Sequence, residues 1–376
     1  MSDASAPLPC RGSAHLTTLV AEVDALVARV RTAVEDAAPA AVTARRAVED
    51  AATATASLAL DGGSGTRTDG DDERDGTWLD ALGRTAGGDL ADAPAPPAGD
   101  AGGSPAAGDA QLVATLSVAE RDGVTAAVAA DDLADAFGRA SADAGGLGAA
   151  LGLLHGRLTA GLVAPERAGR LRRGPRVVHD ASVGRVLFFP TDPVHLADAW
   201  DALLRHVTGT GAAAGGTPPA VRAALLHVEL LRHQPFDAAN GRLARAAARL
   251  ALLADGLLPA GLGTPDVVLA DDPLGYHAEV GASVRRGDAT VWVERALEAQ
   301  TVALARTVEA LAGPPETGPA DAALDGVAPG AAFTLADVMA HTGTSSDDAR
   351  AHCSRLVVAG RAVRTVGSGG LRFTRR

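Results

Sequence analysis

Apolar residues recur at helical spacing along most of the chain, and this periodicity limits the fold more than any other feature. Between residues 14 and 60 the pattern runs through Leu16 and Leu19 and is divided at Pro39, which predicts two helices. From 111 to about 310 the pattern is again mostly helical. Aromatic residues make up only 3% of the chain, so its core must be built from Ala, Leu and Val. These residues favour helices over sheets, and the sequence predicts a mainly α protein.

One segment departs from the helical pattern. Residues 176–189 (RVVHDASVGRVLFF) contain two short β-favouring runs around an Asp-Ala-Ser-Val-Gly turn, which predicts a β-hairpin. Pro190 and Pro193 end it, and helices are expected at 194–207 and 220–232.

Composition shifts divide the chain into four parts. Residues 1–84 are expected to form an N-terminal helical segment, and the Pro/Gly/Ala-rich stretch 85–110 a flexible linker. Residues 111–312 form the predicted core. The sequence GPPETGP at 313–319 marks a boundary before a C-terminal domain at 320–376.

The C-terminal domain has the outline of a winged helix. Two short helices, at 333–339 and 345–359, are followed by a hairpin with a Gly-Ser-Gly-Gly tip. Residues 361–376 hold five arginines and no acid, which suits contact with DNA phosphates. The second helix begins Ser-Ser-Asp-Asp, which disfavours such contact, and winged helices also dock proteins. DNA and a protein partner therefore both stay open.

Charge and composition exclude several classes of protein. The net charge of −12 argues against nucleic-acid binding by the whole chain. All basic residues are arginines, which excludes Schiff-base chemistry and a phosphate loop ending in Gly-Lys-Ser/Thr. No apolar run approaches transmembrane length, and Cys10 and Cys353 have no metal-ligand spacing. We expect a cytoplasmic protein with no membrane partner.

The chemistry-bearing segment is residues 225–250, LLHVELLRHQPFDAANGRLARAAARL. Asn240 and Gly241 open a strong helix, and Arg242 and Arg245 lie in its first turns. A loop that enters a helix N-terminus directs backbone N–H groups and the helix dipole at one point. The two arginines add bidentate phosphate partners, so the segment predicts a nucleotide-phosphate site.

This segment resembles the signature of the Fic/Fido family, His-Pro-Phe-x-Asp/Glu-Gly-Asn-Gly followed by arginines. The resemblance rests on Pro235-Phe236-Asp237-Ala238-Ala239-Asn240-Gly241-Arg242-Leu243-Ala244-Arg245 and on the order of the surrounding helices. It implies a mainly α fold: a Fic-like helical core with one β-hairpin flap, followed here by the winged helix-turn-helix domain. It also implies ATP and Mg²⁺ as cofactors, and a protein target docked on the 176–189 hairpin.

The signature is degenerate, and two registers are possible. With Pro-Phe and Asn-Gly-Arg in place, Gln234 falls on the catalytic His and Ala238 on the metal-binding acid. A shifted register keeps the four-residue spacing with His233 as general base and Asp237 as metal ligand, but it moves the anchoring Phe236 by one place. We prefer the first register.

Two functions follow from the two registers. The shifted register implies an enzyme that transfers AMP from ATP to a protein hydroxyl. The preferred register implies a catalytically silent relative that binds a nucleotide or a partner and acts in regulation, with DNA binding through the winged helix as one route.

A second resemblance lies in the N-terminal segment. Ser57-Leu58-Ala59-Leu60-Asp61-Gly62 is similar to the inhibitory Ser/Thr-x-x-x-Glu-Gly/Asn motif of many Fic proteins. It implies regulatory roles for Ser57, Asp61 and Gly62, with Asp61 approaching Arg245. The alternative is that Asp61-Gly62 only caps a helix.

Other polar and aromatic side chains near these motifs are interpreted as structural. They are His155, His227, Tyr276 and Trp292.

Overall fold

A computed structural model describes residues 6–61, 131–179, 186–208, 216–312 and 327–375, with short gaps in the last range at 329, 347–348, 351–352, 354–355, 358–360 and 368–369. The predicted linker 85–110, Gly62 and the tip of the predicted hairpin lie outside these residues.

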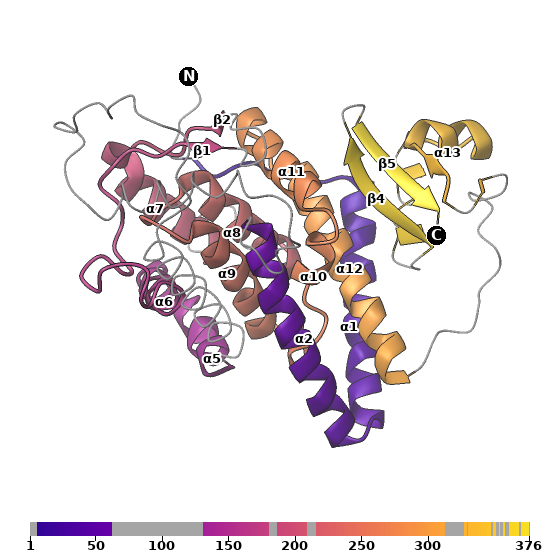
Figure 1. Ribbon diagram of the computed structural model, residues 1–376, viewed down its shortest axis with the longest axis horizontal. Coiled ribbons are helices and arrows are strands. Elements are labelled where there is room, and N and C mark those ends of the chain that lie inside the picture. The colour runs from indigo at the N-terminus through magenta and orange to yellow at the C-terminus, as the bar shows by residue number, and fades with distance from the viewer. Residues whose placement is uncertain are drawn as a thin grey trace, which may run out of the picture.

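The described chain is mainly helical, as the sequence predicts (Figure 1). Its helices are α1 (Ala14–Asp36), α2 (Pro39–Leu60), α5 (Asp131–Ala140), α6 (Ala144–Leu158), α7 (Pro193–Val207), α8 (Pro219–His233), α9 (Asn240–Ala254), the 3-10 turn η1 (Pro259–Gly261), α10 (Asp266–Leu269), α11 (Pro273–Arg286), α12 (Thr290–Ala312) and α13 (Leu335–Thr342). Its strands are β1 (Val178–His179), β2 (Val186–Phe188), β3 (Ala332–Phe333), β4 (Ala362–Gly367) and β5 (Gly370–Arg375).

Local sequence signals fix where several helices begin. The side chains of Ser13, Asp143 and Asp272 accept hydrogen bonds from backbone N–H groups in the first turns of α1, α6 and α11. Proline opens α2, α7, α8 and α11, where the missing N–H has no partner to lose.

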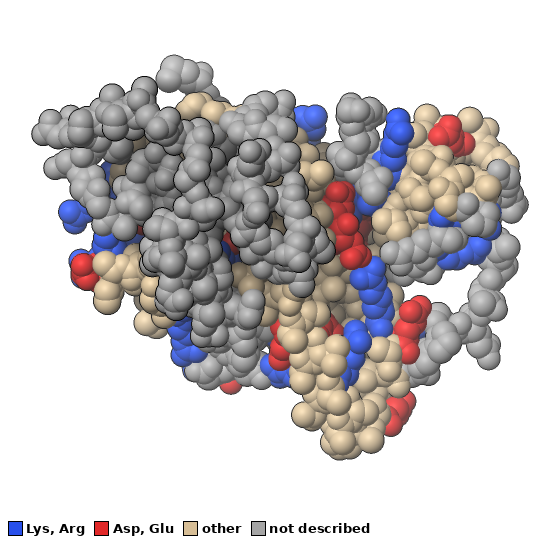
Figure 2. All heavy atoms as spheres, in the orientation of Figure 1, with Lys and Arg blue, Asp and Glu red and all other residues tan. Residues whose placement is uncertain are grey.

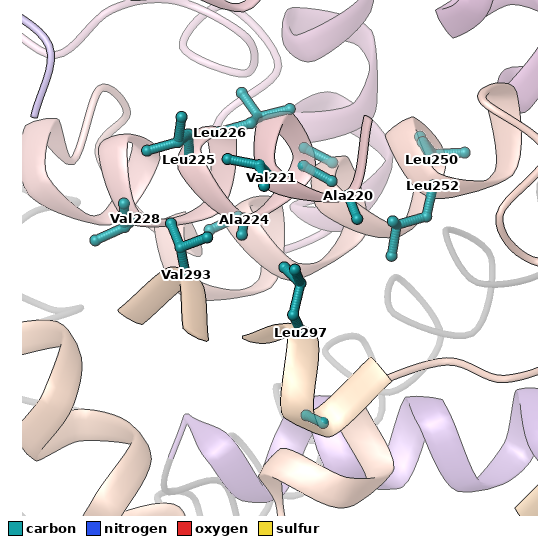
Figure 3. Close-up of a cluster of buried hydrophobic side chains, with 14 of the residues drawn as sticks. Ala220, Val221, Ala224, Leu225, Leu226, Val228, Leu250, Leu252, Val293 and Leu297 are labelled. Atoms are coloured by element: carbon teal, nitrogen blue, oxygen red, sulfur yellow. The ribbon is translucent and has the colours of Figure 1, made fainter. Parts of the chain in front are cut away.

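The core lies where α8, α9 and α12 meet. α12 presents Val293 and Leu297 to the face of α8 that carries Ala224 and Val228 (Figure 3). Small alanines on α8 and α9 let the helix backbones approach closely, so a core with few aromatic side chains can still be densely packed.

The N-terminal helices cover this core from one side. α1 runs beside α12, and α2 leans against α9 and α10, so that the C-terminal end of α2 reaches the start of α9 (Figure 1). α5 and α6 pack on the opposite flank of α9.

β1 and β2, which lie in the predicted hairpin, are short and pair antiparallel, with Val178 opposite Phe188. A hydrogen bond from Arg285 Nη1 to the Leu187 carbonyl (3.1 Å) ties β2 to α11. The base of the hairpin is therefore anchored on the helical core.

The C-terminal residues have a small core of their own. The strands form an antiparallel sheet in the order β3-β5-β4, and α13 begins with a capping box between Thr334 and Asp337. Phe333 and Phe373 stack with ring centroids 5.6 Å apart. The winged-helix assignment for this region stays a prediction.

Buried ion pairs join the C-terminal sheet to the helical core. Arg364 of β4, which is 7% exposed, pairs with Glu279 of α11 (2.8 Å) and with Glu298 of α12. On the described surface seen in Figure 2, acidic and basic side chains gather together at this junction. Arg364 is thus one of the C-terminal arginines that is unavailable to a DNA phosphate.

No helix of the described residues is long and apolar enough to cross a membrane.

Candidate functional site

The predicted phosphate loop joins α8 to α9. α8 ends at His233, and both Gln234 (φ 45°) and Ala239 (φ 53°) adopt left-handed backbone conformations before α9 begins at Asn240. Such conformations disfavour residues that carry a Cβ, so the surrounding structure must hold the loop in this shape. Ala239 occupies the position where the Fic signature has Gly, a departure that the sequence analysis passed over.

Phe236 and Asn240 form the centre of the loop. The Phe236 ring is 1% exposed and stacks on His155 with ring centroids 4.2 Å apart. Asn240 Oδ1 accepts the Phe236 N–H (3.0 Å), and Asn240 Nδ2 donates to the Phe236 carbonyl (2.8 Å). Asn240, predicted to bind nucleotide, therefore uses both polar atoms of its side-chain amide to bond the backbone of Phe236 across the loop.

Arg172 holds the loop from the other side. Its Nε donates to the Gln234 carbonyl (2.7 Å), its Nη2 to the His233 carbonyl (3.2 Å), and its backbone N–H to the Pro235 carbonyl (2.9 Å). The same guanidinium bonds the carbonyls of Gly174 and Thr191 at the base of the hairpin. Sequence reasoning missed Arg172, because backbone acceptors leave no pattern in the side chains.

His155 is also more than a packing residue. The Gly169 N–H donates to Nδ1 (2.9 Å), so Nε2 carries the proton and donates to the Ala238 carbonyl (3.2 Å). Burial lowers the pKa of His155, in agreement with this neutral tautomer.

The two predicted phosphate arginines converge on Asp61. Arg245 Nη2 lies 2.6 Å from Asp61 Oδ1, and Arg242 Nε lies 2.8 Å from Asp61 Oδ2. Arg245 also donates from Nε to the Ser57 hydroxyl (2.9 Å) and from Nη2 to the Ser57 carbonyl (2.7 Å). The expected approach of Asp61 to Arg245 is thus present, together with contacts from Ser57 that place the end of α2 over α9.

Asp61 lies directly on the first turn of α9. A Cβ built on Gly241 would come within 2.4 Å of Asp61 Oδ1, so only glycine leaves room for the carboxylate there. The start of a helix favours negative charge, because its first N–H groups have no partner within the helix. The Asp61 carboxylate therefore occupies the position where an anionic ligand would be most stable.

Behind Arg245 the site is buried and aromatic. Arg245 Nη1 donates to the Tyr276 hydroxyl (3.3 Å), which lies 3.0 Å from His227 Nε2. Burial raises the pKa of Tyr276 to about 12, so the phenol stays protonated. Burial, reinforced by Arg245, holds the pKa of His227 well below its usual range. Burial also opposes the charge of Arg245, but the Asp61 carboxylate outweighs it and raises the pKa of Arg245. Arg245 is thus the fixed positive charge of the site.

His233 and Gln234 do not face this arginine pair. His233 is 1% exposed, with Nε2 3.1 Å from Glu229 Oε2 and Nδ1 2.7 Å from the Thr191 hydroxyl. Both ring nitrogens are engaged inside the protein, so His233 has no free nitrogen to act as a base. Gln234 donates from Nε2 to the Leu231 carbonyl (3.1 Å).

Asp237 points to the outer side of the loop. Its carboxylate pairs with Arg167 (2.8 Å), and its backbone carbonyl accepts a bond from Arg176. Ala238 offers no side-chain oxygen. No cluster of His, Cys, Asp and Glu among the described residues has an arrangement that would hold a metal ion. The Mg²⁺ that the resemblance implies stays a prediction.

Fold and site together define a class of protein: a helical domain in which an inter-helix loop, a helix N-terminus and two arginines meet around an acidic side chain, Asp61. Residues 149–252 match the sequence model of the Fic/DOC family. The chain therefore carries a Fic domain in that range.

One solved structure supports the same fold. A Fic family protein from Desulfovibrio desulfuricans G20 is similar to this chain with a TM-score of 0.53 and 21% identity, over 98% of each chain. A Fic domain containing signaling protein from Bacteroides thetaiotaomicron VPI-5482 gives a TM-score of 0.49 and 16% identity, over 81% of this chain and 100% of that one. No curated protein sequence matches the chain.

Proposed function

We propose that this Fic domain is a regulated nucleotide-binding module that does not transfer AMP. The observation that carries the proposal is the identity and geometry of the loop side chains. In the preferred register Gln234 and Ala238 occupy the positions of the base and the metal ligand, and His233 has both ring nitrogens bonded inside the protein. Without a general base and a metal-binding side chain at these positions, neither activation of a hydroxyl nor neutralisation of the departing pyrophosphate has a residue to perform it.

The binding half of the proposal rests on Arg242, Arg245 and the first turn of α9. An anion there would gain two guanidinium groups and the unpaired N–H groups of the helix. Asp61 now takes that place, with its carboxylate 2.6 Å from Arg245 and 2.8 Å from Arg242. Nucleotide binding is therefore in competition with the end of α2, and displacement of Asp61 is the regulatory step.

The competing function is AMP transfer through His233 and Asp237. It requires His233 to leave both Glu229 and Thr191, and Asp237 to leave Arg167, before either side chain can reach a nucleotide.

The test measures binding and transfer on the same proteins. ATP affinity is measured by calorimetry for the wild type, Asp61→Ala and the control Asp36→Ala, which removes a carboxylate from an exposed position at the end of α1. Asp61→Ala is expected to bind ATP about tenfold or more tightly than the wild type, because one charged competitor is removed. Asp36→Ala is expected to leave the affinity unchanged.

Transfer is measured with labelled ATP, Mg²⁺ and a cell lysate. No labelled protein is expected from the wild type or from Asp61→Ala. Labelled protein that appears, and is lost on His233→Ala, would overturn the proposal that the domain does not transfer AMP. It would establish AMP transfer through His233. Equal ATP affinities for the wild type and Asp61→Ala would overturn the proposal that ATP competes with Asp61 at the start of α9.

A further inference from the structure

A second basic pocket lies on the outer side of the loop. It has a volume of about 360 Å³ and is lined by Glu166, Arg167, Arg170, Leu171, Arg173 and Asp237. Of the loop, only Asp237 takes part in it. Its lining residues do not include Asp61, Arg242 or Arg245, which form the site at the start of α9. We call it the Arg170 pocket.

The charges of the Arg170 pocket are only partly balanced. Arg167 pairs with Asp237 (2.8 Å). Arg170 and Arg173 are both exposed, and neither makes an ion pair with an acid in the described parts of the chain. Two guanidinium groups therefore face the pocket region with their donors available for an anionic ligand.

The backbone that carries these arginines is held in place. The Gly169 N–H is bonded to His155, and Arg172 is bonded to the α8–α9 loop through both its backbone and its side chain. Gly169 has φ 72°, and a Cβ there would lie 2.6 Å from the Gly152 carbonyl, so the segment rests directly on α6. Because the backbone is fixed before binding, a ligand has to order only the arginine side chains.

We propose that the Arg170 pocket binds the phosphate or diphosphate group of a small polar ligand. Planar guanidinium forks match phosphate oxygens in bidentate geometry, and three of them surround this space. Leu171 is the one apolar lining residue, so the pocket offers little surface to an aromatic base or an acyl chain. Its volume falls within the range of small-molecule sites and is compact for an extended acidic peptide.

Pyrophosphate is the probe for the test. Its affinity is measured by calorimetry at low ionic strength for the wild type, in which Asp61 occupies the α9 site, and for Arg170→Gln/Arg173→Gln. The matched control is Arg29→Gln/Arg286→Gln, which removes the same charge from exposed positions on α1 and α11. The pocket variant is expected to bind about tenfold or more weakly than the wild type, and the control within about twofold of it.

The site is located by amide chemical shifts. Pyrophosphate is expected to shift the N–H signals of Gly169 and Arg170 in the wild type and not in the pocket variant. Equal losses in the pocket and control variants would mean attraction by net charge alone and would overturn the proposal. So would the absence of pyrophosphate binding by the wild type.

Further binding measurements distinguish this proposal from the proposed nucleotide site. If pyrophosphate bound only to Asp61→Ala, with no effect of Arg170→Gln/Arg173→Gln, the anion would lie at α9 and the Arg170 pocket would be refuted. Conversely, pocket binding that persists when Asp61→Ala shows no gain for ATP would refute only the α9 site. An acidic peptide that binds at Arg170 and is not displaced by pyrophosphate would replace the small ligand by a protein partner.

Discussion

Ala239 shows how a single residue carries strain at the site. It adopts φ 53° next to the first turn of α9, in a position that glycine would occupy freely. A left-handed conformation costs a residue with a Cβ about 1–2 kcal/mol, so Ala239→Gly is expected to raise the free energy of unfolding by up to about 1 kcal/mol after the added chain entropy. Urea unfolding measures the change.

The neighbouring change Ala238→Gly is the control, because Ala238 is not in the left-handed region. It is expected to lower the free energy of unfolding by about 0.5–1 kcal/mol through chain entropy alone. Equal effects of the two substitutions would show that Ala239 is not strained.

Gly241 and Asp61 form a pair that a double-mutant cycle resolves. A Cβ at Gly241 would lie 2.4 Å from Asp61 Oδ1, so Gly241→Ala is expected to displace the carboxylate and destabilise the protein by about 1–2 kcal/mol. In an Asp61→Ala background the same substitution is expected to be neutral or slightly stabilising, because alanine favours the helix. Additive effects would mean that the carboxylate does not rest on this turn.

His155 gives the loop a pH dependence. Burial lowers its pKa in the folded protein, so the unfolded chain takes up the proton first as the pH falls. Its contribution is complete above the ordinary pKa of about 6.5 and is lost as the pH falls through that value, by at most about 1.4 kcal/mol per pH unit. Unfolding free energies measured from pH 7.5 down to about 5.5 should therefore fall less steeply for His155→Gln than for the wild type.

These residues also mark how far the sequence predicts the site. The contact of Asp61 with Arg245 could be predicted, because both residues lie in motifs that resemble those of Fic proteins. The roles of Arg172 and His155 could not. Both act on backbone carbonyls, which every residue has, so nothing in the neighbouring side chains indicates them.

At the scale of elements, helix starts were the most predictable feature. The predicted helix opening at Asn240-Gly241 is α9, and those at 194–207 and 220–232 are α7 and α8. Capping residues and prolines act locally, so they can be identified from sequence. The docking of α2 could not be predicted in the same way. Much of its contact is polar: Glu49 accepts the N–H groups of Gly263 and Thr264, and Asp50 pairs with Arg249.

The attachment of β4 to α11 and α12 rests on Arg364. Its removal in Arg364→Met leaves Glu279 and Glu298 buried without their closest cation, and burial already raises the pKa of Glu279. We expect a loss of about 3–5 kcal/mol in the free energy of unfolding. The control Arg350→Met breaks a more exposed pair with Glu294 and is expected to cost less than about 1 kcal/mol. Similar decreases in the free energy of unfolding for both variants would show that Arg364 is not the main contact between β4 and the helical core.

At the scale of the whole molecule, this joint predicts that the helical core and the C-terminal sheet unfold together. Cys353 is fully buried in the C-terminal cluster, so its thiol reports opening of that part. In a Cys10→Ser background, thiol labelling of Cys353 and loss of the helical circular dichroism signal are expected at the same urea concentration. Arg364→Met is expected to expose Cys353 first. Early labelling in the parent protein would mean that the two parts unfold independently.

The hydrogen bonds that fix the shape of the α8–α9 loop do not involve the side chains on which its chemistry would depend. Arg172, His155 and Asn240 grip main-chain atoms of residues 233–238, and none of these bonds uses a side chain at position 234 or 238. Substitutions at those two positions therefore remove none of these bonds directly. A loop held in this way can lose the side chains that a reaction needs and still keep its backbone shape.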